Sequence, residues 1–279
     1  MTFSAHVPRK RFGQHWLIDN SVLEKIVAAA DLESTDRVLE IGPGRGVLTE
    51  KLLKSNPALV HGVELDRDLI DGLKKRFANE SKFTLREGDA LAVSLIPPDG
   101  EPANKVVANI PYNITGPLLE RLVGRLGRPT EINYHRLVLL VQKELAQRIL
   151  SLPGQSGFSA LSVRIQLLAR CKSVCEVPPK SFSPPPKVHS QVIILEPLGK
   201  EERLDFKLES RIEVLVRTAF LSRRKKIRNT LAGVCPIDKL EIVAKRQGIS
   251  LDQRPQELSP MVWIELAKSL EKNKIFKNT

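Results

Sequence analysis

Short apolar runs alternate with helix-like segments over the first two-thirds of the chain, and this alternation constrains the fold most. Strand-like runs are expected at residues 37–41, 59–64, 83–86, 106–108 and 137–141. Helical spacing is found at residues 47–54, 67–77 and 117–126. Such a rhythm predicts an α/β fold, with a parallel sheet covered by helices on both faces. In sheets of this kind, ligands bind at the carboxyl ends of the strands.

The character of the sequence changes after residue 177. A proline-rich loop spans residues 177–187, and a strand-like run at 191–195 is expected to add antiparallel pairing to the sheet. From residue 205 to 279 the chain is charged and helical, with 16 Lys/Arg and 9 Asp/Glu, or 16 − 9 = +7 of the total net charge of +12. We therefore expect one domain over residues 1–200 and a small, basic, all-helical domain over residues 205–279.

The net charge of +12 favours a polyanionic partner, and nucleic acid is the first expectation. The alternative is a protein with a lysine-rich surface and no such partner. The three cysteines form no CxxC pair, and no His stands at zinc-finger spacing, so neither disulfides nor a metal site are expected. No run reaches the ~18 apolar residues of a membrane span, and the N-terminus lacks a secretory pattern. We expect a cytoplasmic protein without a membrane segment.

Residues 40–46 read E-I-G-P-G-R-G and come directly after the first strand. Glycines at such a turn let the backbone approach a ligand closely. The dinucleotide-binding fingerprint needs a glycine where Val47 stands, and no Gly-Lys-Ser/Thr is present to form a P-loop. Gly42, Gly44 and Gly46 after Glu40 have instead the spacing typical of S-adenosylmethionine-dependent methyltransferases. Glycine turns of this kind also occur in folds that bind no ligand.

Acidic residues end the next two strands. Glu64 closes the second strand, where a carboxylate can accept both hydroxyls of a ribose. Asp66 is expected to cap the helix that starts near Arg67. Asp89 follows the third strand, in a position to accept the exocyclic amine of an adenine, and its alternative role is a helix N-cap.

The fourth strand is followed by Asn109-Ile110-Pro111-Tyr112. Asn offers an amide oxygen, Pro restrains the chain and leaves carbonyls free, and Tyr offers a face for stacking. Such a turn is suited to holding a flat exocyclic amine beside an electrophilic carbon. The tetrapeptide is short enough to occur by chance, so its meaning depends on the motifs around it.

The motifs, taken in order, resemble those of the ribosomal small-subunit RNA adenine dimethyltransferases of the KsgA/RsmA type, which are related to the Erm resistance methylases. The resemblance covers nearly the whole chain, at residues 10–19, 40–46, 64–66, 88–90, 109–114, 182–190 and 223–231. Two positions depart from the family pattern. His15 stands where Asn is frequent, and Trp16 stands where Phe is frequent.

The resemblance implies a Rossmann-like class I methyltransferase sheet with a small C-terminal all-helical domain. It also implies transfer of methyl groups from S-adenosyl-L-methionine to N6 of two adjacent adenosines in the 3′-terminal hairpin of 16S rRNA. The partner would be the assembling 30S subunit, and the enzyme a monomer.

The resemblance further assigns site residues in this sequence. Those implied to bind the cofactor are His15, Leu17, Gly42, Gly44, Glu64, Asp89, Ala90 and Asn109. Those implied to act on the target base are Asn109, Pro111 and Tyr112. Those implied to bind RNA are Arg223, Arg224, Lys225, Lys226 and Arg228. His15 has the alternative role of a flap over the pocket, and the basic run has the alternative of a solvated helix start.

The residues suggest a mechanism without metal or covalent intermediate. We expect the Asn109 side-chain oxygen and the main-chain carbonyl of Ile110 or Pro111 to accept the two N6 hydrogens of a flipped adenine stacked on Tyr112. Three other functions stay open. They are an Erm-type enzyme acting on large-subunit rRNA, a ribosome-assembly factor that only binds RNA, and a small-molecule methyltransferase.

Overall fold

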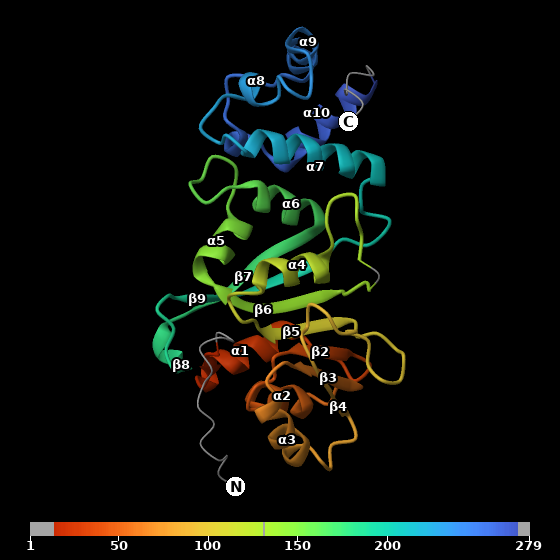
Figure 1. The fold of residues 1–279 in the computed structure, drawn as a ribbon, viewed down its shortest axis with the longest axis vertical. Coiled ribbons are helices and arrows are strands. Elements are labelled where there is room, and N and C mark those ends of the chain that lie inside the picture. The colour runs from red at the N-terminus through yellow and green to blue at the C-terminus, as the bar shows by residue number, and fades with distance from the viewer. Residues whose placement is uncertain (1–13, 131, 273–279) are drawn as a thin grey trace. The chain divides into compact units, whose positions relative to one another are not determined.

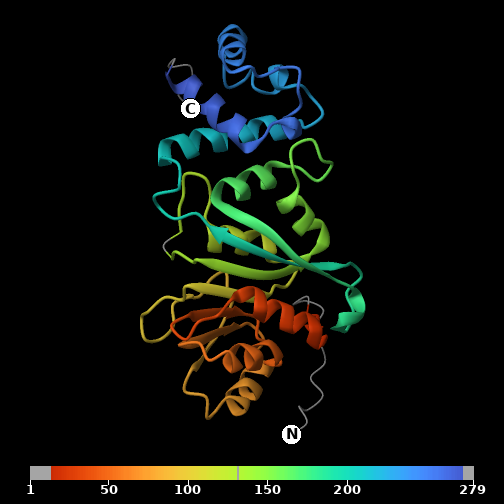
Figure 2. The same cartoon turned by 180° about the vertical axis from the view of Figure 1, so that it is seen from behind.

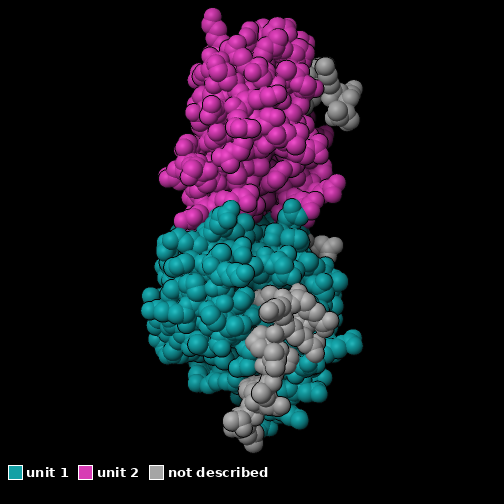
Figure 3. Space-filling view, turned by 60° about the vertical axis from the view of Figure 1, so that its left-hand side comes forward, with its two compact units in different colours: residues 1–123, 130–146, 170–197 teal, residues 124–129, 147–169, 198–279 magenta. Residues whose placement is uncertain are grey.

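The structure, a computed structural model, describes residues 14–130 and 132–272. The chain divides into two compact units (Figure 3). The first consists of residues 1–123, 130–146 and 170–197, and the second of residues 124–129, 147–169 and 198–279. The second unit thus takes in segments that precede the proline-rich loop as well as the C-terminal helices. Whether 1–200 and 205–279 are independent domains stays a prediction.

The first unit is built around a seven-stranded sheet with the strand order β4-β3-β2-β5-β6-β9-β7 (Figure 1). The strands are β2 (Arg37–Ile41), β3 (Leu59–Glu64), β4 (Phe83–Glu87), β5 (Lys105–Asn109), β6 (Arg136–Gln142), β7 (Ala169–Val177) and β9 (Ser190–Pro197). Strands β2 to β6 are paired in parallel, and β9 is antiparallel to β6. The α/β class is therefore confirmed, and the sheet is mixed because the segment after the proline-rich loop adds an antiparallel strand.

The first unit contains α1 (Asn20–Ala30), α2 (Val47–Lys54), α3 (Arg67–Arg76) and α4 (Thr115–Val123). Helices α2, α3 and α4 lie at the segments with predicted helical spacing, and α4 begins and ends two to three residues earlier than expected, whereas α1 was not predicted. The carboxylate of Asp66 accepts the N–H of Asp68 at 3.3 Å, which makes Asp66 the predicted N-cap of α3. No element was expected between residues 143 and 168, where the chain forms α5 (Lys143–Leu150) and α6 (Ala160–Leu168).

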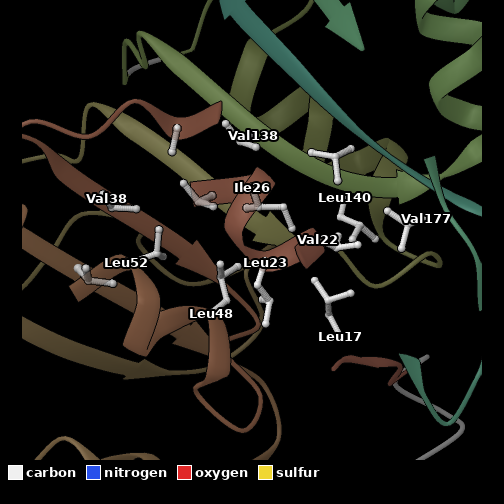
Figure 4. Packing of buried hydrophobic residues seen from close by; sticks show 14 of the residues in the cluster. Leu17, Val22, Leu23, Ile26, Val38, Leu48, Leu52, Val138, Leu140 and Val177 are labelled. Carbon is white, nitrogen blue, oxygen red and sulfur yellow. The ribbon is translucent and has the colours of Figure 1, made fainter. Parts of the chain in front are cut away.

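One hydrophobic core lies between α1, α2 and the sheet (Figure 4). Helix α1 lies against β5 and β6 (Figure 2). Fully buried Ile26 and Leu52 from the two helices meet Val38 and Val107 of the strands. Each side chain of this size contributes about 1.5–3 kcal/mol when it is buried. The cluster fixes β2 and β5, whose carboxyl ends carry the predicted motifs.

The N-terminal segment and the proline-rich segment join the same core. β1 (Trp16–Leu17) pairs antiparallel with β8 (Phe182–Ser183), so that Leu17 lies opposite Phe182. Both side chains are buried in the core cluster. Two short strands far apart in sequence are thus held together by hydrogen bonds and by apolar burial.

The described part of the second unit is helical. Beside α6 it contains α7 (Phe206–Phe220), α8 (Ile227–Thr230), α9 (Ile237–Gln247) and α10 (Pro260–Lys272). Trp263 is fully buried, with its ring centroid 6.1 Å from that of Phe220. Within residues 14–130 and 132–272, no helix combines the length and apolar composition needed to cross a membrane.

A buried histidine in β3 makes the fold sensitive to acid. His61 is fully buried, and its Nδ1 lies 2.8 Å from Oγ1 of Thr84. Burial, with Arg86 nearby, lowers the pKa of His61 from 6.5 to about 4. Since the unfolded chain takes up this proton first, stability is lost as pH falls from 6.5 toward 4.

We therefore expect the free energy of unfolding to fall by about 1–3 kcal/mol over this pH range because of His61. His61→Asn keeps a hydrogen-bonding side chain without a titratable proton, so its stability should fall less steeply. Urea unfolding of both proteins at several pH values measures the difference. Equal slopes would show that His61 is not the group responsible.

Candidate active site

The carboxyl ends of four parallel strands line a cavity of about 270 Å³ in the first unit. β2 leads into Gly42 and Gly44, β3 ends at Glu64, β4 is followed by Asp89, and β5 ends at Asn109. These residues come together because parallel strands present their carboxyl ends at one edge of the sheet. The cavity is also lined by Ala90, Ile110, Pro111, Tyr112, His15 and Trp16.

The glycine turn after β2 has backbone conformations that only glycine adopts without strain. Gly42 and Gly44 have φ of 69° and 60°. A Cβ built on Gly42 would meet no protein atom within 4 Å, so the main chain there is open to the cavity. A Cβ on Gly44 would lie 3.1 Å from Cδ1 of Trp16. Gly42 therefore leaves room for a ligand, while Gly44 leaves room for Trp16.

Glu64 braces this turn from the neighbouring strand. Its Oε2 accepts the main-chain N–H of Gly44 at 2.9 Å, and its Oε1 accepts that of Asp66 at 2.9 Å. Burial raises the pKa of the Glu64 carboxyl, against the lowering effect of these two hydrogen bonds. The main-chain N–H of Leu65 also lowers this pKa, so the carboxylate is held in place by the main chain on both sides of it.

Asp89 follows β4 and lines the same cavity. Its Oδ1 accepts the N–H of Leu91 at 2.8 Å within a turn. No helix begins between residues 88 and 104, so the alternative role of Asp89 as a helix N-cap is wrong. Asp89 lines the cavity beside buried Ala90, and its role as an acceptor of ligand hydrogens stays a prediction.

Glu40 is the most perturbed acid of the site. It is 1% exposed and lines a small second cavity of about 40 Å³, together with Gly42, Trp16 and Asn109. Among the described residues, neither carboxylate oxygen has a hydrogen-bond partner of good geometry. Burial raises the pKa of Glu40 to about 8; the side chain of Thr49 opposes this rise, and the nearby Glu64 adds to it.

The N-terminal segment Gln14–Leu17, called the strap below, crosses the site. Nε2 of Gln14 donates to Asp66 at 2.6 Å, and the guanidinium of Arg45 lies 3.8 Å from the ring centroid of Trp16. Leu17 does not line the large cavity, but it lines the small one beside Glu40. Residues 10–13 of the predicted motif lie outside the described residues.

The turn after β5 is held by its neighbours. Nδ2 of Asn109 donates to the main-chain oxygen of His15 at 3.0 Å. The carbonyl of Pro111 accepts from the N–H of Ile114 and from Oγ1 of Thr115, both at 3.2 Å. No donor to the carbonyl of Ile110 is found among the described residues. Of the two carbonyls considered from sequence, that of Ile110 is thus the one left open.

The basic run lies in the second unit, and its cations have unlike surroundings. Nζ of Lys226 and Nε of Arg228 lie 3.2 and 3.1 Å from Oδ1 of Asp252. Arg223 donates to the main-chain oxygen of Ser156 at 3.2 Å. Arg224 and Lys225 are exposed, and neither forms an ion pair with any described residue.

The three cysteines lie outside the large cavity. The described residues contain no group of three or more His, Cys, Asp or Glu side chains that could hold a metal ion. The three cysteines are free, and burial raises the pKa of Cys171 to about 12 and the pKa of Cys175 and Cys235 as well.

The sequence did not single out every residue that builds the site. Gln14, Trp16 and Ser190 were seen only as parts of motifs, and Ile110 only as one of two candidate carbonyls. For these residues, the only indication in the sequence of a role in the site was that Trp16 departs from the family pattern. Contacts such as that of Trp16 with Arg45 join distant segments and become visible only in the fold.

The comparisons with known proteins agree with this geometry. Residues 5–272 match the family model described as ribosomal RNA adenine dimethylase. The chain is 72% identical to the ribosomal RNA small subunit methyltransferase A of Prochlorococcus marinus, over 98% of both chains. It is 62% identical to the protein of the same description from Synechococcus sp., over 97% of this chain and 96% of that protein.

Two solved structures share the fold. A dimethyladenosine transferase from Plasmodium falciparum is similar with a TM-score of 0.81 and 28% identity, covering 94% of this chain and 99% of that one. The 23S rRNA methyltransferase ErmE is similar with a TM-score of 0.73 and 26% identity, covering 92% and 99%.

Glu40 gives the site a testable pH dependence. Its pKa is raised from 4.5 to about 8, so the unfolded chain releases this proton first, and stability is lost as pH rises between these values. Glu40→Gln keeps the shape of the side chain but not its charge. From pH 5 to pH 8, the free energy of unfolding of the variant should fall by about 2–4 kcal/mol less than that of the wild type. Urea unfolding at several pH values measures this difference. A variant that loses stability as steeply as the wild type would contradict a neutral, buried Glu40.

Proposed function

The chain belongs to the ribosomal RNA adenine dimethylase family, and from this premise we propose that it methylates N6 of two adjacent adenosines in the 3′-terminal hairpin of 16S rRNA. It is an rRNA adenine dimethyltransferase of the small subunit. We further propose that S-adenosyl-L-methionine is the methyl donor, that the assembling 30S subunit is the partner, and that the enzyme acts as a monomer in the cytoplasm.

One observation carries the proposal: the turn Asn109–Tyr112 and the glycine turn at Gly42 line the same cavity. A methyl donor on the glycine side and an amine on the Asn109 side would then share one enclosed space. Transfer between them requires positioning and charge stabilisation more than strong acid or base catalysis.

The residues present suit S-adenosylmethionine. The open main chain at Gly42 and the carboxylates of Glu64 and Asp89 would hold it. The bound cofactor supplies a methyl group already activated by its sulfonium. A protein base or metal is not needed to activate that methyl.

The orientation of Asn109 supports its role toward the base. A main-chain carbonyl can only accept, so the atom of Asn109 that faces the oxygen of His15 is the nitrogen. Oδ1 is therefore turned away from the strap and is free to accept a hydrogen from N6. With the carbonyl of Ile110 as second acceptor, both hydrogens of the amine can be bound and its lone pair directed at the methyl group.

Tyr112 is proposed to stack on the flipped base. Its ring lines the cavity beside the two proposed acceptors. Burial raises the pKa of its hydroxyl, so the side chain stays neutral near pH 7. A neutral ring face binds any base by stacking, and recognition of adenine is left to the acceptors.

Arg224 and Lys225 are the proposed phosphate contacts of the basic run. A cation already paired with a carboxylate must give up that partner before it can bind phosphate. Lys226 and Arg228 share Asp252, whereas Arg224 and Lys225 have no such cost. Lys226 and Arg228 are thus engaged within the protein, and Arg224 and Lys225 are available to bind RNA phosphates.

The target and product can be tested together. Undermethylated small subunits, large subunits and naked rRNA are incubated with labelled S-adenosylmethionine, and nucleosides are identified by mass spectrometry. We expect N6,N6-dimethyladenosine on small-subunit rRNA alone. Product on the large subunit would favour the Erm-type alternative, and its absence everywhere would favour an assembly factor that only binds RNA.

Substitutions in the turn test the mechanism. Asn109→Ala removes one proposed acceptor and should lower kcat by roughly 10²- to 10³-fold, the range seen when one such group is lost. Tyr112→Ala should weaken base binding by about 1–3 kcal/mol. Cofactor affinity is measured separately by calorimetry, and it should survive in Tyr112→Ala. Full methyl transfer by either variant would exclude the assigned role.

Charge reversal tests the basic run. Arg224→Glu/Lys225→Glu should weaken RNA binding and reduce the slope of log K against log salt by about 2, one for each lost contact. Lys239→Glu/Lys245→Glu on α9 changes the net charge equally at exposed positions and serves as the control. Equal effects of the two double variants would indicate that general charge, and not these contacts, binds the RNA.

A further inference from the structure

Tyr112 is restrained at two places by segments distant in sequence. Its hydroxyl lies 2.5 Å from Oγ of Ser190, and its ring is stacked on that of His15, with centroids 5.8 Å apart and planes 25° from parallel. Neither contact belongs to the Asn109–Tyr112 turn itself. The orientation of the ring is thus set from outside the turn.

Ser190 offers a fixed anchor for the hydroxyl. It is fully buried, and as the first residue of β9 it lies opposite Gln142 in the antiparallel pairing with β6. The preceding carbonyl, of His189, accepts the N–H of Lys143 at 2.9 Å. The position of the Ser190 hydroxyl is therefore set by the pairing of β9 with β6 and not by the Asn109–Tyr112 turn.

His15 restrains the ring face. Its Nδ1 lies 2.8 Å from the carbonyl oxygen of Pro184, and since a carbonyl only accepts, Nδ1 carries the hydrogen and donates it. The main-chain oxygen of the same residue accepts from Asn109. The imidazole is therefore tied to the proline-rich segment on one side and packed on Tyr112 on the other.

The spacing of the two rings excludes a base between them. An intercalated base needs about 7 Å between ring planes, because each aromatic contact takes roughly 3.5 Å. The centroids of His15 and Tyr112 are only 5.8 Å apart. A base can stack on Tyr112 only from the face that His15 leaves uncovered.

We propose that Ser190 and His15 are positioning residues that hold Tyr112 with one defined ring face toward the target adenine. The inference rests on the proposed stacking role of Tyr112. The hydroxyl of Ser190 sets the tilt of the ring, and the imidazole of His15 closes its other face. Neither residue touches the reacting atoms.

The restraint matters most for the second methyl transfer. After the first transfer N6 keeps a single hydrogen, so only one of the two acceptors, Asn109 Oδ1 and the Ile110 carbonyl, can still bind it. The plane of the base then depends more on the stacking face of Tyr112. Loosening the ring should slow the second transfer more than the first, and N6-monomethyladenosine should accumulate.

A double-mutant cycle on the hydroxyl pair tests this. Ser190→Ala, Tyr112→Phe and the double variant are assayed for kcat, KM for small subunits and the ratio of mono- to dimethyladenosine. Each single variant should lower kcat by about 3- to 10-fold, the value of one neutral hydrogen bond, and raise the monomethyl fraction. KM should stay within about twofold, and the double variant should be no slower than the slower single variant, because both remove one interaction.

A merely structural role of Ser190 predicts different results. Its loss would then multiply with that of the Tyr112 hydroxyl and would lower the melting temperature or the cofactor affinity. Such multiplication, or wild-type kcat and product ratio in Ser190→Ala, would overturn the proposal. A wild-type enzyme that forms no dimethyladenosine would instead refute the proposed function.

His15 provides a second test that does not depend on the folding of Ser190→Ala. His15→Phe keeps a ring against Tyr112 but lacks the donor, whereas His15→Ala lacks both. We expect His15→Phe to retain the wild-type product ratio and His15→Ala to raise the monomethyl fraction. An unchanged ratio in His15→Ala would overturn the role of the imidazole.

Discussion

The hydrogen bond from the side chain of Asn109 to the main-chain oxygen of His15 joins the parts of the site. It links the end of β5 to the strap, and the strap is linked to the proline-rich segment by the pairing of β1 with β8. The same bond decides which atom of Asn109 faces the cavity. Residues about one hundred positions apart are thereby hydrogen-bonded to each other. The orientation of the Asn109 side chain in the turn after β5 is set by the strap, which lies outside this turn.

Charge in the site is arranged by burial more than by ion pairing. Glu64 accepts the main-chain N–H groups of Gly44 and Asp66, whereas the fully buried Glu40 has the side chain of Thr49 as its polar neighbour. Burial raises the pKa of both, most strongly that of Glu40. With a pKa of about 8, Glu40 is mostly protonated near pH 7, so Glu64 is the one of the two acids that can repel a ligand that brings phosphate. The two carboxyls lie near each other because β2 and β3, which carry Glu40 and Glu64, are adjacent parallel strands.

Much of this architecture was predictable from local patterns. The helix at 47–54 and the strand at 59–64 were predicted to the residue, the helix because its periodic spacing begins directly after the glycine turn. That Glu64, Asp89 and Asn109 lie close together was predicted from the rule that parallel strands have their carboxyl ends at the same edge of the sheet. The assigned roles of the cofactor-binding, base-binding and RNA-binding residues stay predictions, since the fold places them without a ligand.

Contacts between distant segments were not predictable in this way. Helices α5 and α6 and strand β7 were not predicted, although the apolar residues of α5 recur at helical spacing and could have indicated a helix. The basic run shows the same limit at the level of single residues. From sequence its five cations are equivalent, yet Asp252 engages Lys226 and Arg228 and leaves Arg224 and Lys225 to solvent. Since a paired cation must lose one partner to gain another, the position of a single carboxylate decides which of these side chains can bind a polyanion at little cost.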